Sequence, residues 1–254
     1  MPIGLVDRLE RVGDFTAFAL RALRALPAAV GRPAALAEQV YRVLLGSLPI
    51  AAVGAAALGV VAWLQIRGLL FNFQSVGLLP SALALAVVWE FGPVSAGLLS
   101  AARLGAGLGA EIGSMRITEQ IDALRVLAVS PERRLVAPRV LACMLALPLL
   151  TLFIDFIAIL SSFAAETLGG SMTWAEYRLG CLRFLKLPEA VAATLKTVVF
   201  GFLVGVTGCY CGMTAGGGTE GVGRAATRAV VLATLLVLLA DVLLVRVTQL
   251  LLPP

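Results

Sequence analysis

Histidine is absent from the sequence, and only 14% of the 254 residues are charged. Without imidazole, Ser-His-Asp or Cys-His nucleophile activation, histidine-ligated metals and histidine proton relays are excluded. Soluble domains have about 25% charged and about 45–50% apolar residues. Here 60% of the residues are hydrophobic and the mean hydropathy is +0.98. The composition is therefore typical of an integral membrane protein.

Lysine is also scarce, since 18 of the 20 basic residues are arginine. Neither Lys186 nor Lys196 follows a glycine-rich loop, so the chain has no P-loop for ATP. The stretch 216–221 matches GxGxxG, but it follows an apolar helix instead of a strand. We interpret it as a flexible connection whose glycines tolerate positive φ.

The four cysteines have neither the spacing of a metal site nor the setting of a disulfide framework, and we interpret them as small core residues. No cluster of metal ligands is predicted. The basic residues are scattered along the chain and do not form one stripe, which argues against a nucleic-acid partner.

Five apolar stretches are long enough to cross about 30 Å of hydrocarbon. Together with a preceding amphipathic segment they predict an all-α integral membrane protein. Pro49 falls early in the first stretch, so whether that stretch spans fully is left open. The expected spans are Val43 to Leu64, Leu78 to Ala102, Val140 to Ala165, Ala190 to Cys211 and Ala229 to Leu252.

We divide the chain into an N-terminal helical segment, residues 1–42, and a transmembrane permease domain, residues 43–254. Charged residues occupy the place where a signal peptide would need an apolar run. Either a helix lying in the headgroup plane or an amphipathic cap on the bundle fits the pattern of this segment. The apolar residues at roughly helical spacing are Leu5, Leu9, Val12, Ala19, Leu23 and Leu26.

The distribution of Lys and Arg predicts the orientation. With a cytoplasmic N-terminus, the inner segments hold fourteen basic residues and the outer segments five. Five crossings then place the C-terminus outside, in the periplasm. Because an odd number of spans makes internal inverted symmetry awkward, we expect two copies of the chain to supply the two halves of a transporter.

The inner loop between the second and third spans, residues 103–139, contains a predicted short amphipathic helix. Ile117, Ile121 and Leu124 share one face of it, and Pro131 is expected to end it. A rigid helix at this place could transmit force from a soluble motor. It could equally be an inert surface turn.

Four charged residues lie deep within the expected spans, away from their ends: Glu90, Asp155, Lys196 and Asp241. A charge at the bilayer centre costs about 2.5–3.5 kcal/mol on insertion scales, so such residues face a partner or a cavity. We expect Lys196 to pair with Glu90 or Asp241. Since one cation cannot balance three carboxylates, at least one carboxyl group should be protonated or hydrated. The cluster could meet a lipid headgroup, or it could be an interhelical pair that fixes helix register.

Small residues four apart predict close helix contacts, within the chain or at a dimer seam. Two such pairs lie in span four and one in span two: Gly201 with Gly205, Gly208 with Gly212, and Gly97 with Ala101. The outer segment 166–189 carries aromatic and basic residues typical of interface anchoring, and contact with a periplasmic partner is the alternative. The inner segment 212–228 is rich in glycine.

The stretch GAEIGSMRITEQIDAL, residues 109–124, resembles the signature of the MlaE family of ABC-transporter permeases. The stretch GGGTEGVGRAATRAV, residues 216–230, resembles the second cytoplasmic loop of that family, and Gln65 and Glu90-Phe91-Gly92-Pro93 are similar too. The resemblance covers nearly the whole chain.

The resemblance implies an inner-membrane permease that forms a homodimer and moves phospholipids between the inner and outer membranes, which would support outer membrane asymmetry. ATP and Mg²⁺ would be bound by a cytoplasmic MlaF-like ATPase, and this chain would hold no cofactor. A periplasmic MlaD-like MCE protein is the implied lipid-binding partner, and an MlaB-like protein with a STAS domain is a further candidate. Carried onto this chain, the candidate ATPase contacts are Glu111, Arg116, Ile117, Glu119 and Asp122.

Two other classes of protein remain as alternatives. An intramembrane enzyme could use the carboxyl groups as acids and bases, although they lie on separate spans without a GxGD-like motif. A secondary transporter could be driven by the same carboxylates without an ATPase.

Overall fold

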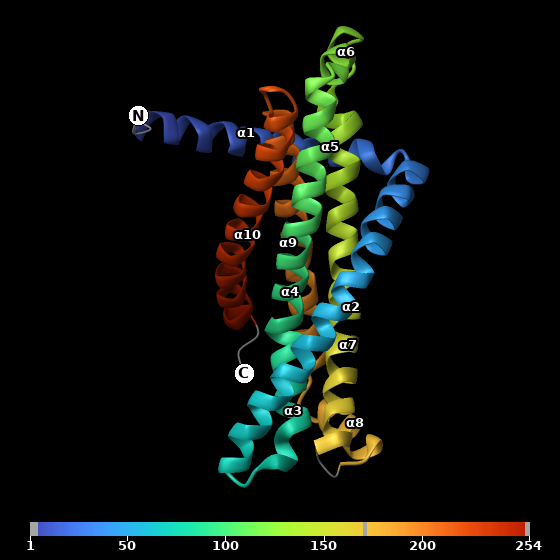
Figure 1. The fold of residues 1–254 in the computed structure, drawn as a ribbon, viewed down its shortest axis with the longest axis vertical. Coiled ribbons are helices and arrows are strands. Elements are labelled where there is room, and N and C mark those ends of the chain that lie inside the picture. Colours follow the sequence, from blue (N-terminus) through green and yellow to red (C-terminus); the bar gives the residue numbers. More distant parts are fainter. Residues whose placement is uncertain (1–4, 170–171, 252–254) are drawn as a thin grey trace. The chain divides into compact units, whose positions relative to one another are not determined.

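The computed structural model describes residues 5–169 and 172–251, and all regular structure within these ranges is helical. The all-α membrane fold is thereby confirmed (Figure 1). The long helices are α1 (Leu5–Val30), α2 (Pro33–Asn72), α7 (Ala137–Gly169), α9 (Leu187–Met213) and α10 (Gly218–Leu251). Between them lie α3 (Leu79–Ala86), α4 (Gly92–Ser100), α5 (Ala106–Ile117), α6 (Gln120–Val126), α8 (Trp174–Arg183), the 3₁₀ turn η1 (Val76–Leu78) and the π-helical turns η2 (Val87–Phe91), η3 (Ala101–Gly105) and η4 (Glu132–Val136).

Five helical stretches of the described residues are long and apolar enough to cross a membrane, and each contains most of one expected span. Every stretch is longer than predicted at one end or at both. Hydropathy marks only the part that fits the hydrocarbon, whereas the helical hydrogen bonds continue through polar flanks. Pro49 lies inside α2 without ending it. The stretches are Pro33–Asn72, Val76–Ile117, Glu132–Gly169, Leu187–Met213 and Gly218–Leu250.

The chain forms two compact units, each assembled from three separate segments. Unit 1 comprises the described residues up to Val43 together with Ser100–Ala146 and Gly201–Val237. Unit 2 comprises Leu44–Leu99, Leu147–Phe200 and the described residues from Leu238 onward.

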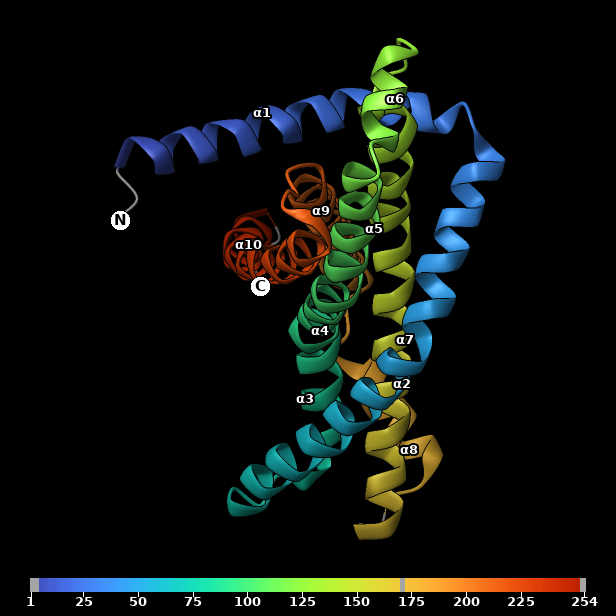
Figure 2. The same cartoon turned by 45° about the horizontal axis from the view of Figure 1, so that its top comes forward.

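In unit 1, α1 runs across the ends of the other helices (Figures 1 and 2). The ring of Tyr210 on α9 lies 5.2 Å from Phe15 and 5.6 Å from Phe18 between centroids. Ala25 and Ala29 pack against Ala137 at the start of α7. The predicted helix is therefore present, but the packed face differs from the predicted apolar face, of which Val12 and Leu23 remain exposed. Part of the segment caps unit 1, and an apolar stripe is left free.

The glycines of α9 lie against neighbouring helices of unit 1. A Cβ on Gly201 would lie 2.5 Å from the carbonyl oxygen of Cys143, and one on Gly212 would lie 2.6 Å from Cβ of Ile112. Gly205 and Gly208 make similar approaches to Val140 and Leu108. The close packing predicted for span four is confirmed, and these contacts are within the chain. All four cysteines are buried and free, as predicted.

In unit 2, the short helix α8 packs beside α3 (Figure 1). Tyr177 of α8 is fully buried against Ala84 of α3, and its hydroxyl lies 2.8 Å from that of Ser162. The prediction that the aromatic residues of this segment anchor at the interface is thus wrong for Tyr177, although Trp174 is exposed. Glu176 accepts hydrogen bonds from the backbone N–H and the hydroxyl of Thr173, which hold the pKa of its carboxyl below the usual value.

A second polar cluster of unit 2 joins α2 to the end of α7. The carboxylate of Glu166 is buried and accepts a hydrogen bond of 2.7 Å from the indole N–H of Trp63. The guanidinium of Arg67 lies 5.1 Å from the centre of the same ring and 3.7 Å from Glu166. Glu166 was not among the predicted intramembrane charges, because it lies one residue beyond the expected third span, Val140 to Ala165.

We expect Gly201→Ala to lower the thermal stability of the purified chain in detergent, because the added methyl group would overlap a backbone carbonyl of α7. Overpacking of this kind costs about 1–3 kcal/mol. Gly223→Ala is the matched control, since no atom lies within 4 Å of a Cβ at that exposed position of α10. Equal melting temperatures for the two variants would contradict the packing described here.

Candidate functional site

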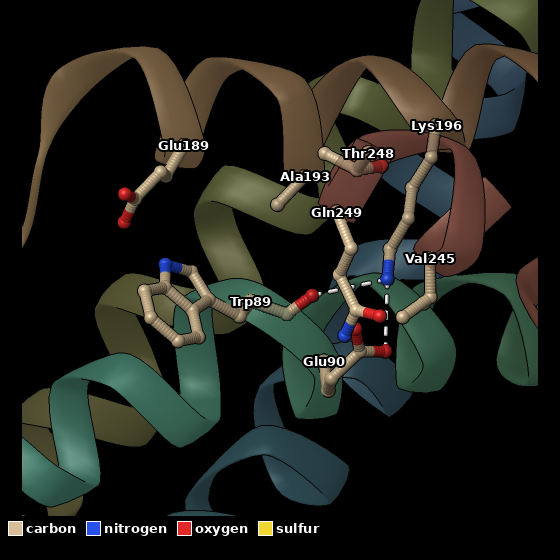
Figure 3. A pocket seen from close by; sticks show the side chains of 8 residues that line it. All are labelled: Trp89, Glu90, Glu189, Ala193, Lys196, Val245, Thr248 and Gln249. Carbon is tan, nitrogen blue, oxygen red and sulfur yellow. Dashed lines mark hydrogen bonds and ion pairs between the residues drawn. The ribbon is translucent and has the colours of Figure 1, made fainter. Parts of the chain in front are cut away.

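The centre of the site is the ammonium group of Lys196, carried by α9 in unit 2. Its side chain is buried, and Nζ lies 2.9 Å from a carboxylate oxygen of Glu90 on η2 and 2.9 Å from one of Asp241 on α10. It also donates a hydrogen bond of 3.0 Å to the backbone carbonyl of Trp89 (Figure 3). The predicted pairing of Lys196 is confirmed, and the lysine is shared between both candidate carboxylates.

The carbonyl of Trp89 is available to Lys196 for a local reason. In an α-helix it would accept a hydrogen bond from the N–H four residues later, but that residue is Pro93, which has no N–H. The backbone is π-helical here, and the N–H of Gly92 bonds to the carbonyl of Val87, five residues earlier. An orphaned carbonyl in an apolar environment needs another donor, and Lys196 supplies it.

A cavity of about 420 Å³ opens beside this cluster within unit 2. The Lys196 side chain is only 4% exposed and that of Asp241 14%, whereas the Glu90 side chain is 41% exposed. Glu90 is therefore the member of the cluster most available to a ligand. The lining residues are Trp89, Glu90, Glu189, Ala193, Lys196, Val245, Thr248 and Gln249 (Figure 3).

Six of these eight lining residues were not predicted from the sequence, namely Trp89, Glu189, Thr248, Gln249 and the apolar Ala193 and Val245. Glu189 lies in the first turn of α9 and also pairs with Lys186 at 3.3 Å. Thr248 and Gln249 lie about two helical turns beyond Asp241 on α10, and that spacing could have indicated them. Trp89 gave no usable signal, because an aromatic residue in an apolar run is ordinarily a core or lipid-facing residue.

Asp155 does not join the cluster, although its depth in span three made this possible. It is buried in α7, and its Oδ1 has no hydrogen-bond partner among the described residues. That oxygen lies where the Cβ of any larger residue at position 92 would be, so Gly92 is required at this contact. Depth along a span does not fix the direction in which a side chain points around the helix axis.

The candidate ATPase contacts lie in unit 1, around the break between α5 and α6. Arg116 binds both carboxylate oxygens of Asp122, at 2.5 and 2.6 Å, and Arg125 approaches the same group at 3.2 Å. Glu111 pairs with Arg139 at 2.6 Å. Glu119 is exposed, and no ion pair is found for it among the described residues. Arg116 and Asp122 are therefore engaged with each other, and Glu119 is the free carboxylate of the turn.

The single short helix predicted for this loop is corrected in two respects. Ile117 ends α5, and the chain turns at Glu119, whose φ of 59° is left-handed, before α6 begins. The helix ends at Val126, where Ala128 adopts a φ of 58° and the N–H of Val129 bonds to the carbonyl of Leu124. This is a Schellman-type end, normally occupied by glycine.

Pro131 is likewise not the residue that ends α6. It precedes η4, which leads into α7, so its fixed φ begins the next helix. The positive φ predicted for the glycine-rich segment is confirmed at Gly217 (87°) and Gly218 (71°). The expected connection is shorter than predicted, because α10 already begins at Gly218.

Comparison with known proteins identifies the family of the chain. The family model described as Permease MlaE matches residues 36–247. The chain belongs to the MlaE permease family.

Relatives of this MlaE-family permease carry matching names. A "Probable ABC transporter permease protein" of Rickettsia typhi is 33% identical over 239 residues, which cover 92% of this chain and 91% of the relative. A protein of the same name from Synechocystis is 32% identical and covers 80% of this chain and 78% of the relative. TRIGALACTOSYLDIACYLGLYCEROL 1 of Arabidopsis thaliana is 36% identical over 67% of this chain and 48% of its own length. The chain is thus a membrane permease subunit of the ABC-transporter type.

We expect Lys196→Met to destabilise this permease strongly, because two carboxylates would lose their shared cation. Removing one partner of a buried ion pair costs about 3–5 kcal/mol. In the triple variant E90Q/K196M/D241N no charge remains, so most of the loss should be recovered. Thermal unfolding in detergent measures this, with Lys186→Met as the control because that lysine is exposed. A triple variant no more stable than K196M would contradict the shared-cation description.

Proposed function

We propose that this permease moves phospholipids between the inner and outer membranes as a homodimer, driven by a partner ATPase. The single observation that carries the proposal is a charged cluster within an otherwise apolar membrane helix bundle, beside a cavity. The chain itself carries out no ATP hydrolysis in this scheme, and the substrate is the lipid.

The cavity suits a headgroup. Its volume of about 420 Å³ lies at the lower end of the range typical of small-molecule sites, which is about 300–1,000 Å³. Its polar wall presents both signs of charge, from Lys196 and from Glu90 and Glu189. The amine of a phospholipid headgroup can meet Glu90, the most exposed charge of this wall, whereas a headgroup phosphate would have to share Lys196 with its carboxylates. The exposed leucines and valines of α10 offer an apolar surface for acyl chains, among them Leu239, Val242 and Leu243.

The relatives support a lipid substrate in one respect. The Arabidopsis relative bears the name of a diacylglycerol lipid, trigalactosyldiacylglycerol. A substrate of the same general class is consistent with an apolar pocket that ends in a few polar groups.

The partners follow from the same reasoning. A permease without a P-loop needs an ATPase, and the turn at Glu119 is the best candidate surface for an MlaF-like subunit, since its carboxylate is free. We assign no partner to Asp155 or to the outer segment 166–189. A periplasmic MlaD-like protein and an MlaB-like accessory protein are proposed as further partners, because the family resemblance implies them. The excess of basic residues on the inner segments supports a cytoplasmic N-terminus, a periplasmic C-terminus and an inner-membrane location.

The lipid role of the cluster predicts a specific loss of transport. The variant E90Q/K196M/D241N should fold and assemble, yet transfer phospholipid at least about tenfold more slowly than the unchanged complex, equivalent to about 1.4 kcal/mol. Donor and acceptor vesicles with the reconstituted complex measure the transfer, and basal ATP hydrolysis reports intact assembly. The control is Arg178→Gln, which removes an exposed charge of α8 that does not line the cavity. Undiminished transfer by the triple variant would refute the headgroup role and leave the cluster as a structural pair.

The α5–α6 turn predicts a separable effect on assembly. Reversal of the exposed charge in Glu119→Arg should reduce the P-loop ATPase recovered with a tagged chain by about tenfold. Arg116→Asp should do the same by misplacing α6, and the swap R116D/D122R should restore recovery by re-forming the ion pair. If the swap fails to restore it, Arg116 contacts the partner directly and does not act by positioning. Glu119→Gly should also lower recovery, because glycine keeps the left-handed turn but removes the carboxylate.

A further inference from the structure

A second cavity, of about 210 Å³, lies in unit 1 where the turn after α1 meets η4 and the start of α7. Four arginines line it, Arg32, Arg133, Arg134 and Arg139, together with the single carboxylate of Glu38. It shares no residue with the cavity beside Lys196. Its charge is opposite in character to the carboxylate-rich cluster in the membrane.

Most of this positive charge has no internal partner. Arg139 is buried and neutralised by Glu111 at 2.6 Å, and Glu38 pairs with Arg42 one helical turn away. No ion pair is found within the described ranges for Arg32, Arg133 or Arg134. Three guanidinium groups therefore surround one small cavity with little compensation, and their mutual repulsion would be relieved by a bound anion.

The level of the cavity relative to the membrane indicates the source of that anion. Helix α1 exposes an apolar stripe that includes Leu20, Leu23 and Val30, as a helix in the membrane interface does. The membrane-crossing helix α2 starts at Pro33, directly after the turn. The cavity thus lies where an interfacial helix becomes a span, which is the level of lipid headgroups.

We infer that this arginine cavity binds the phosphate of an anionic phospholipid headgroup that belongs to the surrounding leaflet. Guanidinium groups bind phosphate oxygens in pairs of parallel hydrogen bonds, and basic pockets beside spans on the cytoplasmic side are suited to anionic headgroups. An acidic protein surface is the other possible partner, but α6, the loop helix, projects past α1 in both views and is better placed to meet a soluble protein (Figures 1 and 2). The inference does not rest on which lipid is transported.

Binding of short-chain lipids to the full-length chain in detergent tests this site. The probes are dihexanoylphosphatidylglycerol, dihexanoylphosphatidylcholine and inorganic phosphate, and the readouts are the thermal unfolding midpoint and native mass spectrometry of bound lipid. Phosphatidylglycerol should bind at least about tenfold more tightly than phosphatidylcholine, and R133Q/R134Q should remove that preference. Both arginines are exposed, so the variant should still fold.

The matched control is R21Q/R24Q, which removes two exposed arginines from α1 that do not line the cavity. It should retain the preference, whereas a general attraction of lipid to positive charge would weaken equally in both variants and overturn the site. Stabilisation by inorganic phosphate equal to that by phosphatidylglycerol would identify a free-phosphate site and overturn the lipid assignment. Unchanged lipid binding by R133Q/R134Q, together with reduced recovery of the ATPase with the tagged chain, would also overturn the lipid assignment. That result would indicate an acidic protein partner.

The two lipid sites are distinguishable. E90Q/K196M/D241N should keep its phosphatidylglycerol preference, and R133Q/R134Q should keep the transport cavity intact. If the triple variant also lost the preference, the arginine cavity would not be an independent site. If only lipid transfer failed to respond to the triple variant, the proposed transport role would fall while the inference about the arginine cavity stood.

Discussion

The structure of unit 2 depends on one buried ammonium group. A charge within hydrocarbon is tolerated only when it is paired, and Lys196 meets two carboxylates and a carbonyl from two different helical stretches. These contacts fix the rotation of η2, α9 and α10 about their axes, because each helix must present a particular side chain or carbonyl. Two carboxylates share one cation, so the cluster is either net negative or holds a proton, and it faces a cavity where water or a ligand can compensate.

The cluster requires an irregular backbone as well as charged side chains. Pro93 withholds the N–H that Trp89 would otherwise bind, and the π-helical turn shifts the register by one residue at the same place. Gly92 then allows Asp155 of α7 to approach the backbone itself. The short stretch Trp89 to Pro93 therefore supplies three features: the charge of Glu90, the carbonyl of Trp89 that accepts from Lys196, and the close approach at Gly92.

Sequence reasoning recovered the features that depend on composition and spacing. Hydropathy alone placed the five spans, and depth alone brought Lys196, Glu90 and Asp241 together as candidates. It could not separate Asp155 from them, since the rotation of α7 is set by tertiary packing. It also missed the break at Glu119 and the helix end at Ala128, because in both a residue other than glycine adopts a left-handed backbone. Such conformations cost about 1–2 kcal/mol and have no local signature when surrounding contacts impose them.

The choice of lysine at position 196, in a chain that otherwise uses mostly arginine, follows from its surroundings. Arginine delocalises its charge over a planar group with five donors, so it suits headgroup phosphates and exposed ion pairs, and 18 of the 20 basic residues are of this type. At position 196 a guanidinium group would bring five N–H donors to two carboxylates and one carbonyl. The site has little room for them, since the lysine side chain there is only 4% exposed. A compact ammonium fits this site, because it donates hydrogen bonds to Glu90 and to the carbonyl of Trp89 and forms an ion pair with Asp241. The lysine is thus determined by the number and placement of its acceptors, and arginine is not an equivalent replacement.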